Sequence, residues 1–342
     1  MLTTSPRLFL TAAVTLLLGS SSLMAADDDP NGVYIRVVDA GPGLCTVSRL
    51  PGDHYMVYDA GHWDFAEICL QAVQEIVPSD EPIDLLVLSH SDSDHLAAVD
   101  EIFDHYTVDR VIRSGNTRWL IRTWRQAYWA IRRARNSGDT VDVNLWRLPN
   151  RQVQPGFAMP YGDTTLTQVS GWNLPPDSWD MHNRSEKNNA GSIVIRLEFA
   201  GRSVLFTGDT IGRHIRDPAD TCIAAEAFMV GNAETVPLRS EVLIAPHHGA
   251  DNGSSTCFIE AVDPDWVIFS AGHDHHHPRE AVADRYLAHG LPTERLLRTD
   301  LGDNEGESEW SLGATSERDR PGDEDVEIKI GADGTVEVAY RE

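Results

Sequence analysis

One short segment constrains this chain more than any other. An apolar run at residues 83–88 leads directly into Ser89-His90-Ser91-Asp92-Ser93-Asp94-His95, and residues 96–103 then have a helical pattern. This pattern predicts a buried strand that ends in a turn carrying two imidazoles and two carboxylates. Such donors suit zinc, manganese or iron, and four of them within six residues can serve more than one ion. A helix cap at Asp94 would explain one acid and neither histidine, so the segment predicts a metal site.

The remaining sequence is typical of an α/β protein. Helical stretches such as residues 65–76 alternate with apolar, β-rich runs. These runs lie at residues 33–38, 55–58, 108–112, 166–169, 193–199, 203–207, 242–245 and 266–270. Turn residues at Ala200-Gly201 and at Asp333-Gly334 predict two hairpins, the second over residues 326–340. We therefore expect a four-layer αββα sandwich with two mixed β-sheets.

The first 25 residues have the pattern of a secretory signal peptide. Arg7 precedes an apolar run at residues 8–18, and small residues follow up to Ala25. That run is about half as long as a transmembrane helix requires. We therefore expect an exported protein, periplasmic or extracellular, without a membrane anchor. Residues 26–342 are expected to form one domain, with an acidic surface loop at about 302–325.

The charge balance excludes general affinity for polyanions. Lysine and arginine number 28 against 53 acidic residues, a formal net charge of −25, which repels nucleic acid and anionic membranes unless a local patch reverses the sign. Residues 110–135 form such a patch, because they hold eight arginines, four aromatic residues and no acid. Several of the arginines are expected on one helical face. They are either an anion-steering patch, led by Arg118, Arg122 and Arg125, or a solvated basic face.

Four cysteines could form two disulfides in an exported protein, and three pairings are possible. The pairs that are closest in sequence are Cys45 with Cys69 and Cys222 with Cys257. Four free, buried thiols remain an equal alternative.

The metal-site segment resembles the metallo-β-lactamase superfamily, whose signature at such a turn is H-x-H-x-D-H. Asp92 stands where most members have the second histidine, and this variant is similar to the hydrolase domain of ComEC-type DNA-uptake competence proteins. The resemblance extends over roughly residues 33–300. Further matching motifs are Asp59-Ala60-Gly61, Asn188-Asn189 before Ser192, Thr207-Gly208-Asp209, Pro246-His247-His248-Gly249, Ser270-Ala271-Gly272, His277-Pro278 and Arg298-Thr299-Asp300.

Two positions depart from the family pattern. Gly41-Pro42-Gly43-Leu44 replaces the opening Gly-Gln-Gly-Asp, so a substrate contact made by the lost acid is not expected here. Asn188 replaces the histidine of the third motif, which weakens the first metal position. With carboxylates in place of imidazoles, manganese becomes a plausible ion beside zinc, which we still favour.

The resemblance implies two divalent ions and a role for each matching residue. His90 and Asp92 would hold the first ion, Asp94 and His95 the second, and Asp209 would bridge both. His247 or His248 would complete the second ion's ligands.

Other residues are implied to act around these ligands. Asp59 would orient a ligand, and Asn188, Asn189 and Ser192 would support ligands or contact substrate. Asp94 and His277 are the predicted catalytic residues, His277 as a general acid or as an extra ligand, although its neighbours leave a merely solvated histidine-rich loop open. His62 is expected to be an exposed loop histidine.

The predicted function is therefore that of a metal-dependent hydrolase. A water shared by the two ions would be acidified and would attack an anionic phosphate ester such as DNA, which makes a phosphodiesterase or nuclease the leading hypothesis. Alternatives are a hydrolase of a small ester, lactone or lactam, a wall or phospholipid headgroup phosphoesterase, and a non-catalytic metal-binding protein. The sequence leaves the substrate, the native metal and the oligomeric state open.

Overall fold

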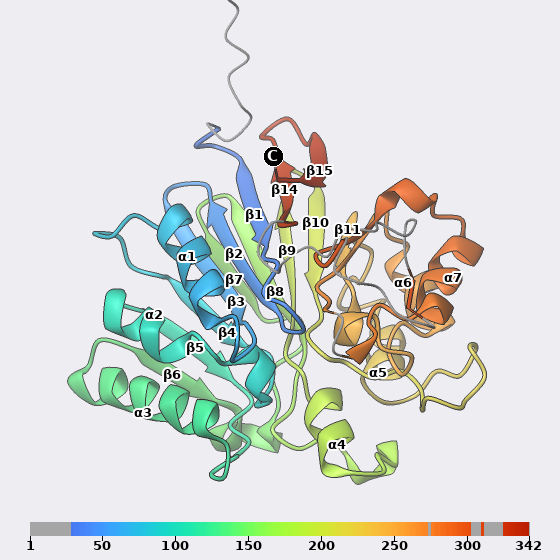
Figure 1. The fold of residues 1–342 in the computed structure, drawn as a ribbon, viewed down its shortest axis with the longest axis horizontal. Coiled ribbons are helices and arrows are strands. Elements are labelled where there is room, and N and C mark those ends of the chain that lie inside the picture. Colours follow the sequence, from blue (N-terminus) through green and yellow to red (C-terminus); the bar gives the residue numbers. More distant parts are fainter. Residues whose placement is uncertain (1–28, 273–274, 302–308, 311–323, 342) are drawn as a thin grey trace, which may run out of the picture.

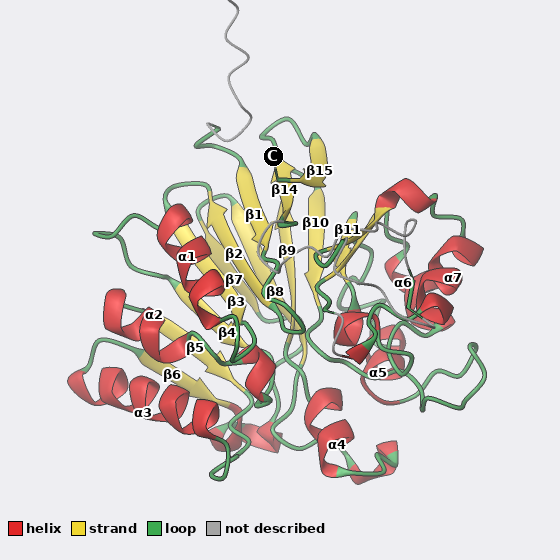
Figure 2. Cartoon of the chain, in the orientation of Figure 1, coloured by secondary structure: helices red, strands yellow, loops and turns green. Residues whose placement is uncertain are grey.

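The computed structural model describes residues 29–272, 275–301, 309–310 and 324–341, so the predicted signal peptide lies outside the described residues. Two sheets pack face to face, and helices cover the outer face of each (Figure 1). Figure 2 shows the same layers by secondary structure. The predicted αββα sandwich is confirmed.

The first sheet has eight strands in the order β15-β14-β1-β2-β3-β4-β5-β6. It is antiparallel from β15 to β3 and parallel from β3 to β6. Its strands are β1 (Val33–Val37), β2 (Cys45–Leu50), β3 (His54–Ala60), β4 (Leu85–Leu88), β5 (Arg110–Arg113), β6 (Val141–Asn144), β14 (Val326–Ile330) and β15 (Val336–Tyr340).

The second sheet has seven strands in the order β13-β12-β11-β10-β9-β8-β7. It is parallel from β13 to β10 and antiparallel from β10 to β7. Its strands are β7 (Ala158–Tyr161), β8 (Thr164–Ser170), β9 (Val194–Phe199), β10 (Arg202–Phe206), β11 (Val242–Ile244), β12 (Trp266–Phe269) and β13 (Leu296–Arg298). Both sheets are mixed, as predicted.

Seven α-helices lie in the described part of the chain. Three cover the first sheet, three cover the second, and α4 lies apart from both layers, below the sheets in Figure 1. They are α1 (Ala66–Ile76), α2 (Val99–His105), α3 (Arg122–Ser137), α4 (Arg184–Ala190), α5 (Ala224–Gly231), α6 (Thr256–Val262) and α7 (Glu280–His289). Within the described residues, none of the helices combines the length and apolar character that a membrane span needs.

The largest core lies between the two sheets. Strand residues alternate between the faces of a sheet, so Ile35 and Tyr58 of the first sheet meet Ile195 and Phe206 of the second, all fully buried. Tyr58 and Phe206 stack at 5.3 Å between ring centroids. The Tyr58 hydroxyl also donates to the Ile193 carbonyl at 2.6 Å, which links the sheets through a hydrogen bond close to the strand ends that carry the predicted metal ligands.

The arginine-rich segment differs from the prediction. Residues 110–113 form β5, the chain then turns at Gly115 (φ 77°), and α3 begins only at Arg122. Arg118 therefore lies in the loop before the helix and not on its face. The helix ends where Gly138 adopts a left-handed φ of 95°.

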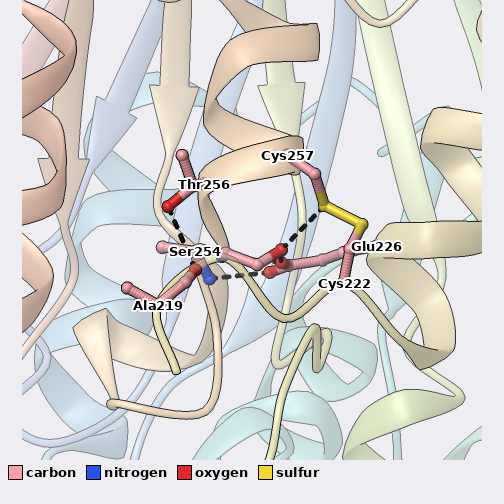
Figure 3. Close-up of a disulfide and its surroundings, with 7 residues drawn as sticks. Ala219, Cys222, Glu226, Ser254, Thr256 and Cys257 are labelled. Carbon is pink, nitrogen blue, oxygen red and sulfur yellow. Dashed lines mark hydrogen bonds between the residues drawn. A yellow bond between two sulfur atoms is a disulfide. The ribbon is translucent and has the colours of Figure 1, made fainter. Parts of the chain in front are cut away.

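Two disulfides join Cys45 to Cys69 and Cys222 to Cys257, the pairs nearest in sequence. The second connects the segment before α5 to the start of α6, where Thr256 Oγ1 donates to the Ala219 carbonyl at 3.0 Å (Figure 3). Glu226 lies beside it, fully buried, and accepts hydrogen bonds from the backbone nitrogens of Ser254 and Ser255 at 2.7 and 2.8 Å. Burial raises the pKa of Glu226 to about 7.

A fully buried arginine lies on β13, at the edge of the second sheet. Arg298, at the end of β13, forms ion pairs with Asp300 at 2.8 Å and Glu309 at 2.5 Å, all three side chains being inaccessible to solvent. The predicted acidic loop at 302–325 falls largely outside the described residues, but Glu309, Trp310 and Asp325 within it are buried and not on the surface. Arg298 thus holds part of this segment in the core.

We predict that Arg298→Ala lowers the free energy of unfolding by about 3–5 kcal/mol, because Asp300 and Glu309 would remain buried without a cation. Urea denaturation measures the change. Arg295→Ala is the matched control, since its ion pair with Asp265 is exposed and should contribute about 1 kcal/mol or less. Equal effects of the two substitutions would contradict the prediction.

We also predict a pH effect of Glu226. Its pKa is raised in the folded state, so its contribution to stability is fully present below pH 4.5 and is lost as the pH rises toward 7. Between these limits the unfolding free energy of the wild type should fall by about 3 kcal/mol relative to Glu226→Gln. Glu260→Gln, an exposed substitution on α6, should leave the wild-type pH profile unchanged.

Candidate metal centre

The predicted metal-binding residues meet at one edge of the sandwich, between the two sheets. Asp59 lies near the end of β3, and the segment containing His90 follows β4. From the second sheet, Asp209 follows β10 and the two adjacent histidines follow β11. The carboxyl ends of parallel strands meet at a common edge, which is why segments far apart in the sequence converge here.

Asp209 lies at the middle of the cluster and is almost fully buried. Its Oδ1 atom is 3.2 Å from His95 Nε2 and 3.4 Å from His248 Nε2. Its Oδ2 atom is 3.5 Å from His90 Nε2 and 3.6 Å from His247 Nε2. The two oxygens of one carboxylate therefore face two different groups of histidines.

The first group contains His90, Asp92 and His247. His90 Nε2 lies 3.5 Å from Asp92 Oδ2, the same distance as from Asp209. The second group contains Asp94, His95 and His248, and one ligand atom from each lies within 4.8 Å of the others and of Asp209. His247 and His248, between which the sequence could not choose, thus belong to different groups.

Asp59 fixes the histidines of the first sheet. Its Oδ2 atom accepts from His95 Nδ1 at 2.8 Å and from Ser89 Oγ at 2.7 Å, and its Oδ1 atom accepts from the Ser89 backbone nitrogen at 2.7 Å. Ser89 Oγ lies 2.9 Å from His90 Nδ1. With its hydrogen donated to Asp59, the Ser89 oxygen accepts from His90 Nδ1, so the Nε2 atoms of both histidines keep their lone pairs for the centre.

The histidines of the second sheet are held in the same way. His248 Nδ1 donates to the Ser270 carbonyl at 2.6 Å, and His247 Nδ1 donates to Asn252 Oδ1 at 2.7 Å. Both residues have left-handed backbone conformations, with φ of 56° and 51°. Such conformations are unfavourable for non-glycine residues and are found where a site requires a particular side-chain direction.

The shifted pKa values show that Asp92 and Asp209, two carboxylates of the centre, are held ionised. Burial alone would raise the pKa of Asp92, but His90 and Arg118 more than offset it and hold that pKa at about 2. Burial likewise opposes ionisation of Asp209, yet the four surrounding imidazoles keep its pKa well below the usual range. Against the effect of burial, Asp209, Asp59 and Asp94 raise the pKa of His95. The cluster therefore favours bound positive charge.

The residues present fit divalent ions. Among the described residues neither His90 Nε2 nor Asp209 Oδ1 makes a hydrogen bond, although both atoms are buried. Buried polar atoms without partners are rare and costly in proteins. Imidazoles and carboxylates that converge in two groups around one shared carboxylate match the donors that zinc and manganese take.

The remaining predicted residues lie around the two groups. Asn188 and Asn189 are buried at the end of α4, and the Asn189 amide is 3.0 Å from His247 Nε2. Asn188 accepts a hydrogen bond from Asn116 at 2.9 Å and lowers the pKa of Asp92. Ser192 Oγ accepts from the Asp209 backbone nitrogen at 3.1 Å and so helps to fix that carboxylate.

His277 lies beside the centre, with its ring centroid 5.9 Å from that of His247 and 6.4 Å from that of His248. Burial and these neighbours lower its pKa to about 2. The imidazole is therefore neutral at physiological pH, which suits a metal ligand better than the general acid that the sequence also suggested.

Two expectations from the sequence were wrong. Arg118 does not lie on the predicted helical face, because it precedes α3, and its guanidinium pairs with Asp92. Arg122 and Arg125 lie on α3 and are exposed, and Arg125 donates to the Trp119 carbonyl at 2.8 Å. His62 is buried and stacks on Trp63 at 3.6 Å between ring centroids, whereas the sequence had suggested an exposed histidine.

A large groove, which sequence reasoning missed, opens next to the first group of ligands. It has a volume of about 830 Å³ and is bordered by the loop before α3, the segment after β6 and α4. Its basic residues are Arg113, Arg118, Arg147, Arg184 and Lys187, and its aromatic residues are Trp119, Trp124, Tyr128 and Trp146. The signal that the sequence offered was a pair of cations, Arg184 and Lys187, that come shortly before Asn188 on α4.

Comparison with known proteins is consistent with this geometry. The family described as the metallo-beta-lactamase superfamily matches residues 38–178. Competence protein ComA of Neisseria gonorrhoeae is 28% identical over 312 residues, which cover 88% of this chain and 35% of that protein. ComE operon protein 3 of Bacillus subtilis (strain 168) is 25% identical over 221 residues, 64% of this chain and 24% of that protein. The chain thus spans only about a third or a quarter of these relatives.

Among solved structures, a metallo hydrolase from the hyperthermophilic archaeon Ignicoccus hospitalis is similar over 86% of this chain and 98% of its own, with a TM-score of 0.44 and 12% identity. The signature around His90, the two-sheet sandwich and the two competence proteins agree with one another. Residues 38–178 match the metallo-β-lactamase superfamily, and the chain is similar over most of its length to a competence protein.

Proposed function

We propose that the protein is a metal-dependent phosphodiesterase that cleaves a nucleic-acid strand lying in the groove beside the metal centre. The observation that carries this proposal is the groove itself, because cationic and aromatic side chains line it together with Arg118 and Asn188, which both interact with Asp92. The names of the two curated relatives, both competence proteins, support a role in DNA handling.

The cations of the groove reverse the charge of the molecule locally. The formal net charge is −25, yet Arg147 and Lys187 point to the groove with side chains that are 55% and 43% exposed. Arg184, on the first turn of α4, and Arg118 also line the groove. Exposed cations arranged along a groove can neutralise successive phosphates of a polynucleotide.

The aromatic residues of the groove offer surfaces for bases. Trp119 and Trp146 are about half exposed, and both line the groove. Trp119 is supported from behind by Trp124 and Tyr128, at 4.7 and 5.0 Å between ring centroids. Bases stack on aromatic side chains with little dependence on sequence, so these residues favour a single strand over a small neutral ester.

The groove and the centre share residues. Asn188 lines the groove and faces Asp92, and Arg118 lines it while pairing with the same carboxylate. A phosphate that enters here meets the Arg118 guanidinium, which can exchange Asp92 for the incoming anion and hold two of its oxygens. Arg118 is thus a substrate-binding residue in this proposal.

We assign the first ion to His90, Asp92 and His247, the second to Asp94, His95 and His248, and the bridging position to Asp209. Two divalent ions, zinc or manganese, would supply an activated water and would stabilise charge on the attacked phosphate. Asp59 and Ser89 orient the ligands of the first sheet, and Asn252 and the Ser270 carbonyl orient those of the second. His277 borders the second group and would serve as a further ligand.

Export remains part of the proposal. Two disulfides are typical of proteins that fold in an oxidising compartment, and residues 1–25 have the composition of a secretory signal. Periplasmic or extracellular protein would meet DNA outside the cytoplasm.

We predict that Asp209→Asn loses bound metal and hydrolytic activity together. The asparagine side chain has one oxygen and one NH2 group, so one of the two ligand groups would lose its shared carboxylate oxygen. Elemental analysis gives the metal content, and turnover of a single-stranded oligonucleotide and of a small aryl phosphodiester gives the activity. Asp163→Asn, on an exposed loop, should behave as the wild type. Full metal content with undiminished turnover in Asp209→Asn would exclude the proposed centre. A wild type that hydrolyses a lactam or lactone but neither diester would exclude the proposed substrate.

A second prediction separates the groove from the basic face of α3. Replacing Arg147, Arg184 and Lys187 together by alanine should lower kcat/KM on a single-stranded oligonucleotide about 10-fold or more and leave a small aryl phosphodiester within about twofold. The log–log dependence of binding on salt should become less steep by about 2.

The matched control replaces Arg122, Arg125 and Arg132 on α3, which removes the same number of charges. This variant should keep the oligonucleotide activity and the salt dependence of the wild type. If instead the α3 variant loses activity and the groove variant does not, the strand binds along the helix and the groove assignment is wrong.

A further inference from the structure

We propose a third divalent-cation site, separate from the metal centre, formed by His182, Glu186 and His214. It takes a zinc-like ion with two imidazole ligands and one carboxylate ligand. The site does not depend on the proposed activity, because none of its three residues belongs to either group of ligands around Asp209.

Three ligand atoms converge in this cluster from two segments of the chain. One atom from each residue lies within 4.8 Å of the others. The Nδ1 atoms of His182 and His214 are each 3.8 Å from Glu186 Oε2. The two rings stack face to face, 3.9 Å apart between centroids and 13° from parallel. Both imidazoles therefore approach the same carboxylate oxygen from one side.

Helix capping explains the glutamate but not the histidines. Asn183 caps α4 by accepting from the Glu186 backbone nitrogen, and Glu186 returns by accepting from Asn183 Nδ2 and from the His182 backbone nitrogen at 3.0 and 2.8 Å. Each carboxylate oxygen has two lone pairs, so Oε2 keeps one for an ion. Capping holds Glu186 Oε2 in place. Capping does not explain why two imidazoles lie beside that oxygen.

The spacing fits a zinc-like ion. Zinc binds nitrogen and oxygen at about 2.0–2.2 Å in tetrahedral geometry, which separates neighbouring ligand atoms by about 3.3 Å. The two observed N–O distances of 3.8 Å would have to shorten, and the stacked rings would have to turn so that their nitrogen lone pairs converge. Such movements are available to side chains that are 59%, 22% and 20% exposed. Three protein ligands leave one position for water.

An ion here would join α4 to the loop that follows Asp209. His182 and Glu186 belong to the start of α4, whereas His214 follows Arg213, which is held by Asp251 at 2.7 Å. The nearby charges are Arg184 on α4 and Asp217, which accepts from the His214 backbone nitrogen at 3.0 Å. Because α4 also carries Asn188 and Asn189, the ion would fix the helix that supports the first group of ligands. His182 also borders the groove.

The test uses zinc alone, with four full-length proteins: the wild type, His182→Ala/His214→Ala, Asp209→Asn, and the combination of all three substitutions. Each is stripped with chelator, equilibrated with zinc and analysed for bound metal. We expect about three ions in the wild type, one fewer in the double histidine variant, and one ion in Asp209→Asn that is lost in the combined variant. Cobalt in the Asp209→Asn protein should give a d–d absorption spectrum that the combined variant lacks.

Two controls keep the outcomes distinct. His105→Ala, an exposed histidine at the end of α2, should bind as much zinc as the wild type. Glu186→Gln keeps the cap but removes the charged ligand, so it should lose the same ion without a change in circular dichroism. Equal zinc in the wild type and the double histidine variant overturns the third site. A wild type that binds only one ion, which the double histidine variant loses, would instead overturn the proposed centre and leave the third site standing.

Discussion

Four carboxylates, those of Asp59, Asp92, Asp94 and Asp209, lie largely buried at the junction of the two sheets, and their mutual repulsion has to be offset for the fold to close. Burying an ionised carboxylate is very costly unless it is paired. Four imidazoles, one guanidinium and the Ser89 hydroxyl surround the acids and offset part of this cost. The left-handed backbone at Asp59 and at both histidines after β11 belongs to the same requirement, since each directs a polar side chain inward.

The distribution of charge over the molecule supports the functional proposal. A chain with a formal charge of −25 should repel a polyanion, yet the lining of the groove is cationic where it approaches the centre. Arg118 lies where the two regions meet and is neutralised by Asp92 until an anion competes for it. Such a boundary concentrates attraction at the entrance to the site and keeps the rest of the surface unattractive to nucleic acid.

The strand pattern and the motif around His90 were readable in the sequence because both depend on neighbours along the chain. The same is true of the hairpin at Ala200-Gly201, whereas the sequence left the disulfide pairing open. The groove could not be read, since Trp146 and Arg184 meet only after the sheets have packed. Arg118 was placed on a helix because the arginines follow a helical spacing, but β5 and the turn at Gly115 use up the first part of that segment. The choice between His247 and His248 likewise required the backbone turn that separates their rings.

Neither half of the sandwich contains all the ligands of the proposed centre. Asp209 and both histidines after β11 come from the second sheet, whereas His90 to His95 come from the first. The affinity of the proposed centre for its ions therefore depends on how stably the two halves are docked. By mass action, an ion that binds only the docked state shifts the equilibrium toward it, by an amount that grows with the ratio of free ion to the dissociation constant. When metal is scarce, the first effect on this protein would then be weaker docking of the two halves of the sandwich.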